Sequence, residues 1–279
     1  MQIGIIAGTG ELPVIVAKDA RERGYRVITV ALENLAPREM DGISDEIRWV
    51  NPGRLGEIIS TLKKHRVKEA IMAGKVPKSL LYKSKITPDL RAVKLLFSIK
   101  DRTDDAILSA LTKELECEGI QIIDTVKFSP HLLTPEGCLT ARQPDEEQWK
   151  DVEFGWGIAK EIGKLDIGQT VVVKGRAVMA VEAIEGTDEA ILRGGHWADE
   201  GAVVVKVSKP QQDMRLDVPA VGMDTVKSME KVRARVLALE AGRSMIMGRD
   251  AVLREAERAG IVVVGISAET LHCRRSKGH

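Results

Sequence analysis

Acids, amides and bases gather between residues 164 and 222, around short apolar runs, and the densest group is KPQQDMRLDVPAVG over residues 209–222. If this segment is extended, alternate residues face the same way, so Asp213, Arg215 and Asp217 share one face. Two carboxylates with a guanidinium between them suit a Mg²⁺ ion and a phosphate oxygen. A surface ladder of ion pairs is the alternative. The polar residues nearby give the functional interpretation more weight.

Those neighbouring polar residues flank predicted strands. Glu182 interrupts an apolar strand, which either places it on a solvated face or gives it a function. Thr187 and Asp188 also have a plain structural explanation, because threonine is a good N-cap for the helix that follows. Lysines after the next strand can neutralise phosphate oxygens. The candidates in this group are Gln169, Glu182, Glu185, Thr187, Asp188, Lys206, Lys209 and Gln211.

Two glycine turns follow predicted strands nearer the N-terminus. The first is Gly8-Thr9-Gly10, and the second carries Gly74 and Lys75. Backbone amides at such a turn can cradle a phosphate at a helix N-terminus. Pro13 stands where the third glycine of a dinucleotide fingerprint belongs, so an intact NAD site is disfavoured. A phosphate or sugar-nucleotide loop and an ordinary tight turn both stay open.

Strands and helices alternate along the first half, which predicts a parallel sheet with crossover helices. Pro130, Pro135, Gly137 and Pro144 interrupt the pattern, and residues 131–145 are interpreted as a linker. The fold prediction is α/β: an N-terminal Rossmann-like parallel-sheet domain over 1–130 and a second α/β domain over 146–279. In the second domain we expect a hairpin turning at Gly175 and Arg176, helices over 225–241 and 249–259, strands over 202–207, 218–223 and 261–266, and a frayed tail from His272.

Bulk composition excludes several classes of protein. The 279 residues carry a formal net charge of +1 and only 3% aromatic residues, which argues against a nucleic-acid partner. Three widely spaced cysteines give no zinc or disulfide pattern and indicate a reducing cytoplasm. The N-terminus begins directly with a predicted strand, and no apolar run reaches the length of a membrane span.

A basic stretch mixed with apolar residues begins at the second glycine turn. Lysine and apolar side chains along a helix suit an anionic membrane surface, or a ligand with phosphate at one end and acyl chains at the other. An ordinary amphipathic helix with a solvated basic face is the simpler interpretation. The helix around residues 95–97 is the candidate acyl groove. The basic residues are Lys75, Lys78, Lys83, Lys85, Arg91, Lys94 and Lys100.

Nearly the whole chain resembles the LpxI-type UDP-2,3-diacylglucosamine pyrophosphatases of Gram-negative bacteria. The resemblance lies in IAGTGELP, AGKV, DDAIL, KEIGKLDIGQ, AVEAIEGTD and KPQQDMRLDVPAVG, in this order. It implies Mg²⁺-dependent hydrolysis of UDP-2,3-diacylglucosamine to UMP and 2,3-diacylglucosamine 1-phosphate (lipid X), a step towards lipid A. It also implies an N-terminal Rossmann-like domain, a distinct α/β C-terminal domain, and a substrate in the cleft between them.

The resemblance places the family's essential aspartate at Asp217 and matches Glu182, Glu185, Lys206, Lys209 and Gly222. We expect Asp217, Asp213 and Glu182 to be catalytic, and Asp217, Asp213 and Glu185 to bind the metal. The expected substrate-binding residues are Gly8, Thr9, Gly10, Gly74, Lys75, Gln169, Thr187, Asp188, Lys206, Lys209, Gln211 and Arg215.

Two other functions stay open on the sequence: an NAD-dependent nucleotide-sugar oxidoreductase, and a non-catalytic protein that binds a lipid or a sugar nucleotide. Tight NAD binding would favour the first. A stable ligand without Mg²⁺-dependent hydrolysis would favour the second. For the hydrolase we expect a cytoplasmic protein that touches the inner face of the inner membrane, and a homodimer through a C-terminal helix is left open.

Overall fold

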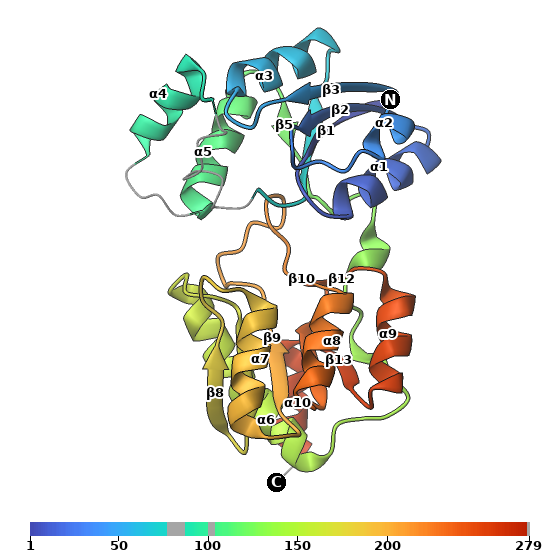
Figure 1. Cartoon of the computed structure of the whole chain (residues 1–279), viewed down its shortest axis with the longest axis vertical. Helices are drawn as coiled ribbons and strands as arrows, with labels where there is room; N and C mark the ends of the chain where they lie inside the picture. The colour runs from blue at the N-terminus through green and yellow to red at the C-terminus, as the bar shows by residue number, and fades with distance from the viewer. Residues whose placement is uncertain (77–86, 100–103, 278–279) are drawn as a thin grey trace. The chain divides into compact units, whose positions relative to one another are not determined.

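The computed structural model describes residues 1–76, 87–99 and 104–277 (Figure 1). The chain forms two compact units. One contains Met1–Pro130 together with Met214–Leu216, and the other contains His131–Asp213 and Asp217–His279. Each unit has its own sheet and its own buried core, which confirms the predicted α/β class with a sheet in each half.

The N-terminal unit is built on a parallel five-stranded sheet. Its order is β3-β2-β1-β4-β5, with β1 (Gln2–Ala7), β2 (Arg26–Leu32), β3 (Glu46–Val50), β4 (Glu69–Ala73) and β5 (Gln121–Ile122). Apolar runs such as that of β1 are buried on both faces, as a parallel sheet covered by helices requires.

Helices of this unit contribute to two core clusters. One cluster includes residues of α1 (Leu12–Glu22) and α2 (Met40–Ile43). The second includes residues of α3 (Leu55–Lys64) and α5 (Asp104–Cys117), and α4 (Leu90–Ser98) packs against it.

The C-terminal unit has a mixed six-stranded sheet in the order β6-β13-β11-β9-β7-β8. Strands β9 (Val203–Lys206), β11 (Val236–Glu240) and β13 (Val262–Ile266) are parallel. Strand β7 (Thr170–Lys174) runs antiparallel to both β9 and β8 (Ala177–Val181), and β6 (Gly137–Cys138) runs antiparallel to β13. Strands β10 (Ala220–Val221) and β12 (Met245–Ile246) form a separate parallel pair.

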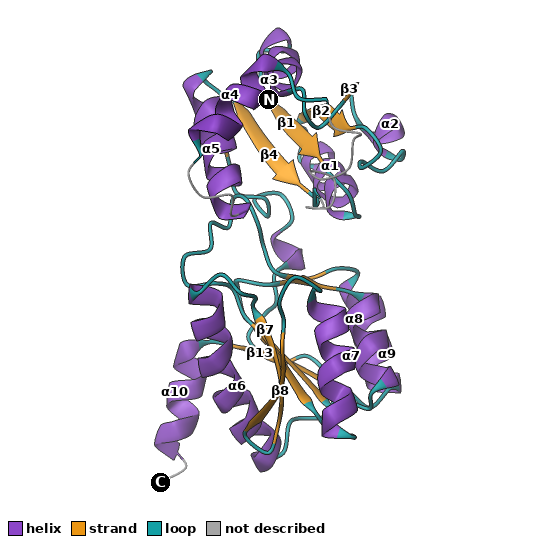
Figure 2. Cartoon of the chain, turned by 60° about the vertical axis from the view of Figure 1, so that its left-hand side comes forward, coloured by secondary structure: helices purple, strands orange, loops and turns teal. Residues whose placement is uncertain are grey.

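Helices cover both faces of this sheet (Figure 2). On one face lie α7 (Thr187–Ala198), α8 (Met223–Lys231) and α9 (Arg249–Arg258), and on the other lie α6 (Glu146–Lys164) and α10 (Ala268–Lys277).

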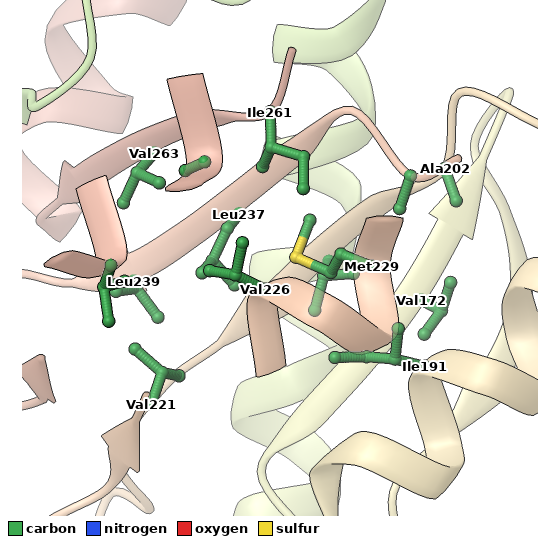
Figure 3. Packing of buried hydrophobic residues seen from close by; sticks show 14 of the residues in the cluster. Val172, Ile191, Ala202, Val221, Val226, Met229, Leu237, Leu239, Ile261 and Val263 are labelled. Atoms are coloured by element: carbon green, nitrogen blue, oxygen red, sulfur yellow. The ribbon is translucent and has the colours of Figure 1, made fainter. Parts of the chain in front are cut away.

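The two faces of the sheet have separate cores. Figure 3 shows the packing on the face of α7 and α8, where Ile191 and Met229 from the helices meet Val172, Leu237 and Val263 from the strands. Residues of α6 and of alternate positions on the same strands make up a different cluster. The period of two along a strand thus sends successive side chains into different cores.

Several predicted elements need correction. Residues 225–241 are not one helix: α8 ends at Lys231, Arg233 has a left-handed φ of 53°, and β11 follows. The helix-forming composition of this run misled the prediction, because burial of β11 between two neighbouring strands decides its conformation. Residues 131–145, interpreted as a linker, contribute β6 to the sheet edge and group with the second unit. The tail expected to fray is helical through Lys277.

No helix among residues 1–76, 87–99 and 104–277 has the length and apolar character needed to span a membrane. Of the basic stretch, Lys78, Lys83, Lys85 and Lys100 lie outside the described residues. Lys94 on α4 is exposed. Two apolar side chains of the same helix, Leu90 and Phe97, are 89% and 84% exposed.

Candidate functional site

Charged and polar residues meet at the carboxyl edge of the sheet in the C-terminal unit. Lys206 and Glu240 are the last residues of β9 and β11, and Glu182 follows β8, which runs in the same direction as β9. Helix α7 begins after the loop that leaves β8, and α8 begins after the long loop from β9 and the short strand β10. Open α/β sheets bind ligands at this edge, because strand ends and helix N-termini present polar groups together.

Lys206 and Glu182 form a buried ion pair at this edge. Their side chains are 4% and 11% exposed, and Lys206 Nζ lies 3.6 Å from Glu182 Oε2. The Thr187 hydroxyl joins them, because it donates to Glu182 Oε1 at 2.9 Å and accepts from Lys206 Nζ at 2.8 Å. Lys206 Nζ also donates to Thr170 Oγ1 at 3.2 Å. Sequence reasoning missed Thr170, which faces Lys206 across the β7–β9 pairing.

The charge state of Glu182 follows from these contacts. Burial by itself would raise the pKa of this carboxyl, but the charge of Lys206 and hydrogen bonds from Thr170 and Thr187 outweigh it, so the pKa is lowered. Glu182 is therefore an ionised carboxylate near neutral pH. It holds Lys206 and Thr187 in place, and its catalytic role stays a prediction.

Gln169 lies next to this ion pair. Its backbone N–H approaches Glu182 Oε2 at 3.4 Å, and its buried Oε1 has no hydrogen-bond partner within the described part of the chain. Gly168 allows this approach, since a Cβ there would come within 2.0 Å of the Glu182 carbonyl oxygen. A buried amide oxygen without a protein partner is an acceptor available to a ligand or a cation.

The loop over residues 208–219 carries Asp217 and is held by its own amides. Gln212 Nε2 donates to Asp217 Oδ2 at 3.0 Å and to the Asp217 carbonyl at 3.1 Å. Gln212 Oε1 accepts from the backbone N–H of Lys209 at 3.2 Å, and the Lys209 ammonium pairs with Asp166. Gln211 Nε2 donates to the carbonyl of residue 163 at 3.1 Å. These contacts give the carboxylate of Asp217 a fixed setting.

The expectation that Asp213, Arg215 and Asp217 share one face of an extended segment is wrong. Residues 214–216 form a turn, and Asp217 N–H donates to the Asp213 carbonyl across it at 3.2 Å. These three turn residues belong to the N-terminal unit, where Leu216 packs against a core cluster and Arg215 pairs with Glu116 at 3.2 Å. Tertiary packing, and not the local alternation of residues, shapes this loop.

The remaining acids of the predicted set have separate partners. Asp188 Oδ1 accepts from Thr225 Oγ1 at 2.8 Å, which links the first turns of α7 and α8. Glu185 pairs with Arg193, and both line a hollow along α7. Across residues 1–76, 87–99 and 104–277, no group of three or more His, Cys, Asp or Glu side chains is placed to hold a metal. Asp217, Asp213 and Glu185 therefore do not form such a cluster.

The glycine turns of the N-terminal unit pair with each other. Gly8 N–H donates to the Ala73 carbonyl at 2.8 Å, and the backbones of Thr9 and Lys75 exchange hydrogen bonds of 2.9 and 3.1 Å. A Cβ on Gly74 would lie 2.5 Å from the Thr9 carbonyl oxygen. The close approach of the two turns therefore requires a residue without a side chain at position 74. Three amides of these turns are therefore engaged within the protein. Substrate binding by the two turns, Gly10 included, stays a prediction.

Comparison with known proteins covers both halves of the chain. The family model described as the LpxI N-terminal domain matches residues 2–132, and the model described as the LpxI C-terminal domain matches residues 135–264. A curated protein of Caulobacter vibrioides named UDP-2,3-diacylglucosamine pyrophosphatase LpxI is 31% identical over 279 residues, which covers 96% of this chain and 98% of the relative.

Proposed function

The chain belongs to the LpxI family, and we propose that it hydrolyses the pyrophosphate bond of UDP-2,3-diacylglucosamine to UMP and 2,3-diacylglucosamine 1-phosphate, a step towards lipid A. The observation that carries this proposal is the group of charged and polar residues at the carboxyl edge of the C-terminal sheet. There a buried lysine, a loop that holds the Asp217 carboxylate by hydrogen bonds and the buried Oε1 of Gln169, which has no partner among the described residues, come from the same segments that resemble the family.

Hydrolysis of a diphosphate needs cations against the phosphate oxygens and a positioned water. Lys206 supplies a cation whose position Glu182 and Thr187 fix, and Lys209 supplies another on the loop that follows β9. Because Lys206 is almost fully buried, its charge acts in a medium of low dielectric constant and is screened little by water. We assign these two lysines to the diphosphate, and Gln169, Thr187, Asp188, Gln211 and Arg215 to further substrate contacts.

Asp217 is the proposed catalytic carboxylate. Gln212 binds one of its oxygens, Oδ2, and the residue is only partly buried, so a carboxylate oxygen is available to a water or a metal ion. The proton released when water attacks phosphorus needs an acceptor, and an ionised carboxylate in a fixed position can take it. Asp213, whose carbonyl accepts from Asp217 N–H, is the second acid assigned to this step.

The donor chemistry of this loop fits Mg²⁺. In proteins this ion is usually bound by one or two carboxylates together with substrate phosphates, so it needs no cluster of three acids. Asp217 and Asp213 would hold it, with the buried oxygen of Gln169 as a further candidate. Glu185 is the weakest of the predicted ligands because Arg193 already pairs with it. When bound, Mg²⁺ would neutralise phosphate charge and lower the pKa of a bound water.

Contact with a membrane surface is proposed because the substrate carries two acyl chains. The exposed Leu90 and Phe97 on α4, with Lys94 between them in the sequence, support a transient contact or an acyl groove. A cytoplasmic location at the inner face of the inner membrane and a homodimer stay predictions. Vesicle co-sedimentation tests the membrane contact, and light scattering tests the dimer.

The experiment for the activity is incubation of the purified protein with UDP-2,3-diacylglucosamine and Mg²⁺, followed by chromatography of the nucleotide product. We expect UMP in the presence of Mg²⁺ and almost none after chelation with EDTA, with recovery when Mg²⁺ is added back. UDP-N-acetylglucosamine, which lacks the two long acyl chains, is the control substrate and should react far more slowly. If the diacyl substrate gives no UMP under any of these conditions, the proposed activity is wrong.

A further inference from the structure

A carboxylate outside the predicted set, that of Glu240, holds the first residue of the loop that carries Asp217. Glu240 ends β11 and is 7% exposed. Its Oε2 accepts from the backbone N–H of Ser208 at 2.7 Å and from the Ser208 hydroxyl at 2.9 Å. Ser208 is fully buried. One acidic side chain thus fixes both the backbone and the side chain of a residue just beyond the neighbouring strand.

Two cations complete the contacts around Ser208. Lys160 of α6 donates to both oxygens of Glu240 at 2.7 and 2.6 Å and to the Ser208 carbonyl at 3.0 Å. Arg243 Nε donates to the Ser208 hydroxyl at 2.7 Å. Charge-assisted hydrogen bonds of this kind, in a buried setting, are strong and directional. Stability alone does not call for a buried ion pair, because packed apolar residues stabilise a fold as well.

Hydrogen bonds connect the loop residues that follow Ser208 with Asp217. Lys209 follows Ser208 directly, and its backbone N–H donates to Gln212 Oε1 at 3.2 Å. The amide nitrogen of Gln212 in turn donates to Asp217 Oδ2 at 3.0 Å. A shift of Ser208 would therefore move both the ammonium of Lys209 and the carboxylate of Asp217.

We propose that Glu240 is a positioning residue for the hydrolysis: through Ser208 it sets the place of Lys209 and Asp217 without touching the substrate. The role rests on the proposed function. It extends that function to a residue outside the sequence-based candidates, since the sequence pattern predicts a helix over 225–241 and gives Glu240 no part in the site. A misplacement of about 1 Å at a reacting group can cost on the order of 100-fold in rate.

The test compares two double variants, K160M/E240L and K160M/E240Q. Both remove the ion pair as a whole, so neither leaves one of its two charges buried alone. Only the glutamine keeps an oxygen that can accept from the Ser208 N–H. We expect kcat to fall about 10- to 100-fold in K160M/E240L, with a smaller change in KM, and to return to within about fivefold of wild type in K160M/E240Q.

Asp151 provides the matched control. It is 6% exposed, lies on α6 like Lys160, and accepts from the backbone N–H groups of Gly175 and Arg176 at 2.9 and 2.5 Å in the β7–β8 turn. Asp151→Leu should destabilise the same unit yet leave kcat of the folded enzyme unchanged. Wild-type kcat in K160M/E240L, or an equal loss of kcat in Asp151→Leu, would overturn the positioning role.

Amide hydrogen exchange gives a readout that needs no substrate. Exchange across residues 208–217 should quicken in K160M/E240L and slow again in K160M/E240Q, while the Asp151 variant should quicken local exchange in the β7–β8 turn and leave local exchange over 208–217 unchanged. If the wild-type protein releases no UMP, the proposed function fails and the positioning role falls with it. If exchange over 208–217 is unchanged in K160M/E240L, the positioning role of Glu240 is wrong, while the proposed hydrolysis is unaffected.

Discussion

The carboxyl edges of the two sheets are held by different kinds of interaction. In the N-terminal unit, the turns after β1 and β4 are joined by backbone hydrogen bonds, and glycines make the close approach possible. In the C-terminal unit, the strand ends carry one buried and one partly buried ion pair, and hydrogen bonds run from there into a loop with an acidic side chain. Backbone pairing stabilises a fold. Burying charged side chains costs folding free energy, and such groups are concentrated at catalytic and binding sites. This contrast is why we assign the reacting acid and the cations to the second unit.

The largest effect should follow loss of the buried lysine. Lys206→Met leaves Glu182 as a buried carboxylate without its ion-pair partner, which typically costs about 3–5 kcal/mol of unfolding free energy. Urea unfolding measures this loss, and UMP release measures activity. The matched variant K206M/E182L removes both charges, and we expect it to recover most of the stability but not the activity. Full activity in K206M/E182L would show that the charges serve only the fold.

A glycine variant tests the other unit. Gly74 has a φ of +88°, and a Cβ would meet the Thr9 carbonyl oxygen at 2.5 Å, so Gly74→Ala should destabilise by about 1–3 kcal/mol. Thermal unfolding measures this loss, and KM of the folded fraction tests substrate binding by this turn: a KM near wild type would mean that Gly74 serves only the fold. Gly157→Ala, at an exposed helical position with open space, is the control and should stabilise by up to about 1 kcal/mol. A KM raised tenfold or more in Gly74→Ala would instead support the phosphate-binding prediction.

A smaller difference between the two units is expected in how their buried and partly exposed acids make the free energy of unfolding depend on pH. The lowered pKa of Glu182 means that its contribution is present above the ordinary value of 4.5 and is lost as the pH falls through the lower folded value. Hydrogen bonds from Lys63 and Arg91 lower the pKa of Glu118, in the N-terminal unit, to about 2, so its contribution has the same sign. The Glu118 pairs lie near solvent, so salt should weaken their effect, whereas the buried pair of Glu182 should respond little.

Urea unfolding between about pH 5 and about pH 3, at low and high salt, separates the two acids. Glu182→Gln should flatten the pH dependence at both salt concentrations. Glu118→Gln should flatten it mainly at low salt. The same salt response in both variants would contradict the difference in burial between the two regions.

Local pattern predicted the parts of the fold that local physics decides. The buried runs of β1 and β4, the hairpin turning at Gly175 and Arg176, and the short helix α9 need only hydrophobic pattern and turn residues, and the structure confirms them. Strand β11 could not be read in this way. Its residues suit a helix, and only its place between β13 and β9 makes it a strand.

The candidate site, too, could be predicted from the sequence only in part. Glu182, Lys206 and Thr187 stand out one by one in the sequence, and the structure brings these three together because β8 and β9 end at one edge. Glu240 could not be found, since its strand was not predicted. The expected geometry of the loop that carries Asp217 was wrong, because Leu216 packs in the N-terminal unit and turns the chain. Contacts between residues distant in sequence decide such features.

The rate of UMP release by Asp217→Asn tests the central claim most directly, namely that the acid on the 208–219 loop carries the hydrolysis. Asparagine keeps the size of the side chain and a carbonyl oxygen for Gln212, so the variant should fold with an unchanged thermal midpoint. We predict a fall in kcat of at least about 100-fold with Mg²⁺ present, because the variant lacks the carboxyl group that would accept the proton. A kcat within about threefold of wild type in the folded variant would contradict the account.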